Sequence, residues 1–171
     1  MKYCYVLGRR NIYTKMHTST KYKSAANNVT SLGSVVPKQL VEDTTKALSK
    51  LKVALGGDVR GYVACRLHMN MTELKDALAA EQVDGVALAM YNIGKRAQSV
   101  IIGDQTGIGK GRQAAAMIRY GLLSGYLPVF FTDRYTLFSD MYRDCKALGI
   151  KDARPLVVNA GVSVVDFDHI I

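Results

Sequence analysis

The chain has 171 residues, 49% of them apolar, and a formal net charge of +9, so we expect one basic domain with a hydrophobic core. Its three cysteines are far apart, with no paired spacing and no histidine at ligand spacing, which argues against a disulfide framework and a zinc site. No run approaches the roughly 20 apolar residues of a membrane-spanning helix, and we therefore predict a cytoplasmic protein.

The basic excess lies at the N-terminus. Residues 1–40 contain seven Lys or Arg and no Asp or Glu, whereas the rest of the chain carries 16 basic and 14 acidic residues. Residues 1–34 show no sustained hydrophobic period, so we expect a flexible basic arm. A solvated leader would explain such an arm. Contact with nucleic acid is the alternative, because tyrosines that can stack on bases alternate with the charges.

Residues 35–76 are predicted to form a helical lead-in. Pro37 can open a first helix, since Leu and Val recur after it at helical spacing. The pattern of residues 58–67 leaves a short strand and a helix open. Asn70 or Thr72 can cap the next helix.

From residue 77 onwards, helical and strand patterns alternate. A helix beginning at Gln82 is followed by a short apolar strand at 100–102, and a second helix begins after a glycine loop. Residues 127–131 (LPVFF) predict a buried strand parallel to the first one. Further along, the pattern predicts a helix stopped by Gly149, and a third strand at 156–158. The predicted buried faces are Val83, Val86, Ala87, Met90 and Tyr91; Ala114, Met117, Ile118, Gly121 and Leu122; and Leu137, Met141, Cys145 and Leu148.

The glycine loop, GDQTGIGKGRQ at residues 103–113, has the layout of a phosphate site. Glycines allow backbone N–H groups to turn toward phosphates, and the N-terminus of the following helix favours an anion. Lys110 can reach the outer phosphates, and it is the one catalytic residue that we predict. The predicted nucleotide-binding residues here are Asp104, Gln105, Thr106, Gly107, Ile108, Gly109, Lys110, Gly111 and Arg112.

The loop departs from the usual G-x-x-x-x-G-K-S/T pattern at both ends. Asp104 stands at the first glycine position, and Gly111 replaces the hydroxyl residue that normally meets Mg²⁺. With these departures, DQTGIGKGR resembles motif I of superfamily 2 helicases. Its GKGR ending is similar to that of the Strawberry notch family of helicase-like NTPases.

The resemblance implies an incomplete α/β, RecA-like P-loop NTPase fold, with a parallel sheet flanked by helices. This partial first lobe would span residues 77–171 and follow a mainly helical, partly disordered N-terminal region. It also implies ATP and Mg²⁺ as cofactors. Gln82 resembles the glutamine that recognises adenine in the superfamily, because a carboxamide can donate and accept at once. Thr106 would be a substitute metal ligand.

The segment TDRYTLF resembles motif Ia, which implies that Thr132 and Arg134 hold a DNA or RNA backbone; a polar loop without a ligand is the alternative. The metal-binding acid and the second lobe would lie further on, in this chain or in a separate one, because Asp166 is followed by Phe167 and is a weak candidate. Two other functions stay open: a self-contained P-loop nucleotide kinase, and a nonenzymatic adaptor that binds nucleic acid through its basic arm.

Overall fold

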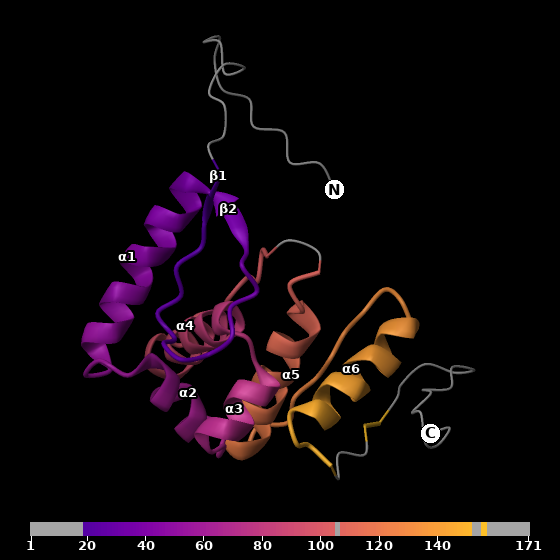
Figure 1. The fold of residues 1–171 in the computed structure, drawn as a ribbon. Helices are drawn as coiled ribbons and strands as arrows, with labels where there is room; N and C mark the ends of the chain where they lie inside the picture. The colour runs from indigo at the N-terminus through magenta and orange to yellow at the C-terminus, as the bar shows by residue number, and fades with distance from the viewer. Residues whose placement is uncertain (1–18, 105–106, 152–154, 157–171) are drawn as a thin grey trace.

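The computed structural model describes residues 19–104, 107–151 and 155–156, which are mainly helical (Figure 1). No helix among them is long and apolar enough to cross a membrane. The elements are β1 (Ser19–Lys21), β2 (Val35–Pro37), α1 (Lys38–Ala54), α2 (Val59–Arg66), α3 (Met71–Ala77), α4 (Ala80–Arg96), α5 (Lys110–Leu123) and α6 (Thr136–Ala147).

Strands β1 and β2 form a small antiparallel sheet in which Thr20 lies opposite Val36. The segment between the strands runs back over α4 and is hydrogen-bonded to it. Tyr22 donates to the Asp84 carboxylate at 2.9 Å, and the amide of Leu32 donates to Glu81 at 3.0 Å. The predicted domain boundaries stay predictions, but residues 19–34 are packed here rather than forming part of a flexible arm. Residues 1–18 lie outside the described residues.

The lead-in helices begin where the sequence predicts. Pro37 is the N-cap of α1, since its fixed φ suits a helix start. Asp58 accepts a hydrogen bond from the Gly61 amide at 2.8 Å, which caps α2 and decides residues 58–67 in favour of a helix. Asn70 caps α3 in a reciprocal arrangement with Glu73, so two N–H groups gain acceptors that the helix itself does not supply.

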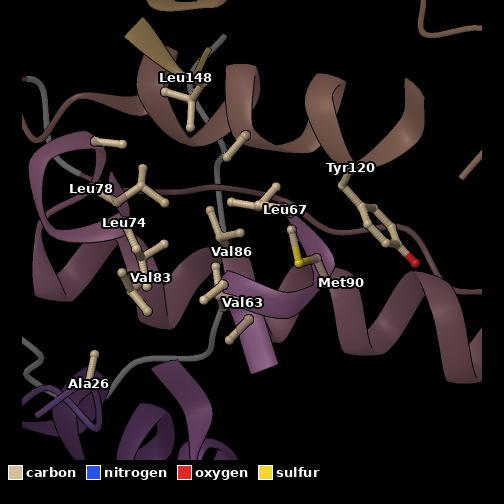
Figure 2. Close-up of a cluster of buried hydrophobic side chains, with 14 of the residues drawn as sticks. Ala26, Val63, Leu67, Leu74, Leu78, Val83, Val86, Met90, Tyr120 and Leu148 are labelled. Carbon is tan, nitrogen blue, oxygen red and sulfur yellow. The ribbon is translucent and has the colours of Figure 1, made fainter. Parts of the chain in front are cut away.

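Helix α4 occupies the centre of the core and packs against α1, α2 and α5. Four of its five predicted stripe residues are buried, with Tyr91 partly buried beside them. Figure 2 shows how side chains from the neighbouring helices meet this stripe, which fixes α4 in place. The labelled core residues include Val63, Leu67, Leu74, Leu78, Val83, Val86, Met90 and Tyr120.

Helix α5 packs between α4 and α6. None of the five residues of its predicted buried face is fully buried, although Ala114, Met117 and Ile118 pack partly buried against the core. The buried residues of α5 are Gln113, Ala115, Ala116 and Tyr120, whereas Leu122 is exposed. Arg119 donates to the carbonyl oxygens of Leu67 and Leu148, where α2 and α6 end. These bonds give acceptor carbonyls at two helix ends a charged donor.

The predicted parallel sheet is not seen among the described residues, where β1 and β2 form the one sheet. Residues 100–102 and 127–131 are not strands, and Ile101 and Phe131 are 93% and 87% exposed. A strand is stable only when its backbone groups pair with a neighbour, and an apolar sequence cannot supply that pairing alone. Of the third predicted strand, residues 157–158 lie outside the described part of the chain.

Candidate functional site

As the sequence predicts, residues 103–109 of the glycine loop lead directly into α5, which begins within the predicted loop segment. Gly107 and Gly109 have φ angles of +95° and +79°, in the region that residues with a Cβ rarely adopt. Gly109 is the N-cap of α5, and Lys110 is its first residue. The first amides of a helix have no acceptor within it, so the loop brings amide donors to the positive end of α5.

Two side chains of α5 join the helix to the start of the loop. Lys110 Nζ donates to the Asp104 carbonyl oxygen at 2.8 Å, and Gln113 Nε2 donates to the Asp104 carboxylate at 2.7 Å. Gln113 is buried, whereas Asp104 is exposed. Hydrogen bonds from Lys110 and Gln113 therefore join residue 104 to the first turn of α5. Gln105 and Thr106 lie outside the described residues, and their predicted nucleotide and metal contacts stay predictions.

Gln82 lies against the same loop. Its Nε2 atom donates to the Ile108 carbonyl oxygen at 2.8 Å, and its Oε1 atom accepts from the Ala79 amide at 2.9 Å. A Cβ added at Gly109 would overlap Gln82 Nε2, so the glycine permits this close approach. Gln82 thus supports the loop from α4. Its predicted role in binding adenine would need these contacts to be exchanged for contacts with the base.

On the other side of α5, Asp144 of α6 approaches Gly111. A Cβ added at Gly111 would overlap Asp144 Oδ2, while Oδ1 lies 3.4 Å from Arg112 Nε. Arg112 also donates to the Ala77 carbonyl oxygen at 3.2 Å. A carboxylate oxygen is the kind of ligand that Mg²⁺ prefers, so the space beside Gly111 holds a donor that fits a magnesium ion.

A cavity of about 340 Å³ opens beside this cluster. It combines one carboxylate with two guanidinium groups, and it reaches the first turn of α5. Positive charge and a helix N-terminus together favour a polyanion. Its lining residues are Ala77, Gln82, Gly109, Arg112, Arg143 and Asp144.

A family model described as "P-loop containing NTP hydrolase pore-1" matches residues 37–166. The chain belongs to this family. No curated protein and no solved structure matches it. The matched region includes α1 to α6 and the glycine loop, so the P-loop NTP hydrolase assignment agrees with the loop and helix geometry.

Two other predicted positions in this P-loop NTP hydrolase domain are hydrogen-bonded to each other. Thr132 Oγ1 donates to the Arg134 carbonyl oxygen and accepts from the Arg134 amide, each at 3.2 Å. This local turn precedes α6. Gly111 lies against Asp144, and Arg119, further along α5, bonds to Leu148, further along the chain. The two helices therefore run in the same direction, and the start of α6 lies beyond the amino end of α5. The predicted nucleic-acid contacts of both residues stay predictions, and Asp166 lies outside the described residues.

Sequence reasoning missed Gln113 and Asp144, which the packing of α5 between α4 and α6 brings to the site. A signal was present for both. Asp144 falls in the same helical stripe as Met141, Cys145 and Leu148, and Gln113 falls in the stripe of Ala116 and Tyr120. A polar residue within a buried stripe is expected to have a specific partner, because burial without one is costly.

The thiol of Cys145, next to Asp144 in the sequence, is buried. Desolvation and the neighbouring carboxylate raise the pKa of Cys145 to about 11. The thiol therefore stays protonated and unreactive at neutral pH, and its burial agrees with the buried face on which the sequence places Cys145.

Proposed function

We propose that this chain binds ATP together with Mg²⁺ and forms the nucleotide-binding part of a helicase-like, nucleic-acid-dependent NTPase. The glycine loop at the amino end of α5 carries the proposal, because Lys110 and the positive end of the helix dipole lie together there. Membership of the P-loop NTP hydrolase family supports nucleotide binding and hydrolysis.

Lys110 would bind the β- and γ-phosphates by exchanging one acceptor for another. Its ammonium group now donates to the Asp104 carbonyl oxygen at 2.8 Å, within the loop that would surround the phosphates. A phosphate oxygen carries more negative charge than a carbonyl oxygen, so it is the stronger acceptor for an ammonium group. Bound magnesium would neutralise part of the phosphate charge.

The helicase-like part of the proposal rests on the resemblance of DQTGIGKGR to the Strawberry notch family and of TDRYTLF to motif Ia. Thr132 and Arg134 would contact the backbone of a DNA or RNA strand. The acid that binds the metal and the residues that stabilise the transition state would come from a further lobe, in this chain or another.

Nucleotide affinity tests the proposal directly. We expect Lys110→Ala to weaken binding of a fluorescent, non-hydrolysable ATP analogue, because a hydrogen bond to a charged group contributes about 1.5–3 kcal/mol, or roughly 10- to 150-fold in affinity. Lys75→Ala, at an exposed position of α3, is the matched control and should bind like the wild type. Equal affinity for all three proteins would contradict the proposal.

A further inference from the structure

The first observation concerns the residue after the phosphate-binding lysine. Position 111 carries a glycine where the usual P-loop pattern has a hydroxyl group for the metal ion. The space that a side chain at this position would fill is taken by Asp144 Oδ2, from α6. An oxygen from a distant part of the sequence therefore lies where the motif lacks its own oxygen.

Asp144 lies beside two arginines, Arg112 of α5 and Arg143 of α6. Its Oδ1 atom lies 3.4 Å from Arg112 Nε and 4.0 Å from Arg143 Nε, and its side chain is only 13% exposed. Because both ion pairs use Oδ1, they leave Oδ2 directed at the first turn of α5. The carboxylate is thus held by α5 and α6 together.

We infer that Asp144 replaces the missing hydroxyl as the protein's oxygen ligand for the magnesium ion that accompanies the nucleotide. This inference rests on the proposed function. Mg²⁺ is a hard cation that is usually bound by one or two carboxylates together with phosphate oxygens. Asp144 supplies one such carboxylate beside the helix end that would receive the phosphates.

The surrounding charges determine when the ion binds. Two guanidinium groups lie within 4.0 Å of Asp144, and they repel a free cation. Among the described residues, no group of three or more His, Cys, Asp or Glu is placed to hold a metal. We therefore expect phosphate oxygens and water to complete the ligand set, and magnesium to bind together with the nucleotide.

The test compares the affinity of a fluorescent, non-hydrolysable ATP analogue in Mg²⁺ with its affinity in EDTA. We expect Mg²⁺ to strengthen binding to the wild type, and Asp144→Asn to reduce this enhancement roughly tenfold or more, as changes near metal sites typically do. Affinity in EDTA should change little. Asp43→Asn, at an exposed position of α1, should keep the full enhancement.

A double variant tests whether a hydroxyl at position 111 can replace the Asp144 carboxylate as magnesium ligand. It also provides a test if Asp144→Asn does not fold. Gly111→Ser with Asp144→Ala restores the motif hydroxyl and removes the carboxylate that would overlap it. We expect this protein to regain a Mg²⁺ enhancement that Asp144→Ala alone lacks.

Three outcomes would overturn the inference. An enhancement in Asp144→Asn equal to that of the wild type would do so while leaving the proposed nucleotide site intact. A gain in affinity in both Mg²⁺ and EDTA would show that Asp144 only competes with phosphate. A wild type that binds no analogue at all would overturn both the inference and the proposed function.

Discussion

At the scale of single residues, three glycines of the loop differ in what a methyl group would meet. Gly103 has a negative φ and open space around it. Gly107 has a φ of +95° and open space, whereas Gly109 combines a φ of +79° with the overlap against Gln82 Nε2. Substitutions at these three positions therefore separate the cost of backbone strain from the cost of disturbing the contact with Gln82.

We therefore predict a graded series of stabilities for the three Gly→Ala variants in urea unfolding. Gly103→Ala should change the free energy of unfolding by less than about 0.5 kcal/mol. Gly107→Ala should lower it by about 1–2 kcal/mol, the cost of a Cβ in the left-handed region. Gly109→Ala should lower it further, because Gln82 must also lose hydrogen bonds. Equal effects at 107 and 109 would contradict the support role of Gln82.

The residue scale also shows what the sequence could predict of the site. A loop of glycines followed by lysine and a helix is local, so Gly109, Lys110 and their placement could be predicted from one stretch of sequence. The contact of Gly111 with Asp144 joins positions 33 residues apart. It depends on how α5 packs on α6, which no local pattern specifies.

At the scale of elements, residues 19–34 are hydrogen-bonded to two carboxylates of α4 whose pKa values shift in opposite directions. Burial raises the pKa of Asp84, which accepts hydrogen bonds from the Tyr22 hydroxyl and the Ala25 amide. Desolvation also acts on Glu81, but hydrogen bonds from Ser31 and the Leu32 amide hold its pKa below the usual value. The folded state therefore binds a proton more tightly at Asp84 and less tightly at Glu81.

This difference predicts how stability depends on pH. Since Asp84 has a raised pKa in the folded state, its contribution to the free energy of unfolding falls as pH rises from 3.8 toward the raised value. Asp84→Asn should remove that fall. The stability that Glu81 contributes should still be lost as the pH drops below its usual pKa. Asp76→Asn, at an exposed site of α3, is the control; an identical pH profile for both variants would contradict the prediction.

Helices were easier to predict than strands, and the reason is physical. Caps and apolar stripes are local, so the helices after Pro37 and Asn70 were predicted correctly. The segments 100–102 and 127–131 have strand-like composition, yet a strand also needs a hydrogen-bonding neighbour that composition does not reveal. The described residues supply none, and the prediction of a parallel sheet was wrong for them.

At the scale of the whole molecule, the same segments leave apolar side chains in water. Leu127, Val129 and Phe131 are 89%, 65% and 87% exposed. Exposed apolar groups that follow one another along the chain favour association with other apolar surfaces. We expect this region to bind hydrophobic dyes and to promote self-association.

Phe131→Ser should therefore reduce dye binding and light scattering while changing the free energy of unfolding by less than about 0.5 kcal/mol, because the ring is already exposed. Phe138→Ser is the matched comparison, since that ring packs edge-on against Phe130 with centroids 6.1 Å apart. It should lower stability instead. Equal loss of stability in both variants would show that Phe131 is packed in solution.

The central claim is that the loop amides at the start of α5 receive a triphosphate. Amide NMR spectra of the labelled protein, recorded during titration with Mg²⁺ and a non-hydrolysable ATP analogue, test it most directly. We expect the largest shifts at Gly107, Gly109, Lys110 and Gly111, because their N–H groups would gain phosphate acceptors. Saturable shifts confined to other helices, with these four signals unchanged, would contradict the claim.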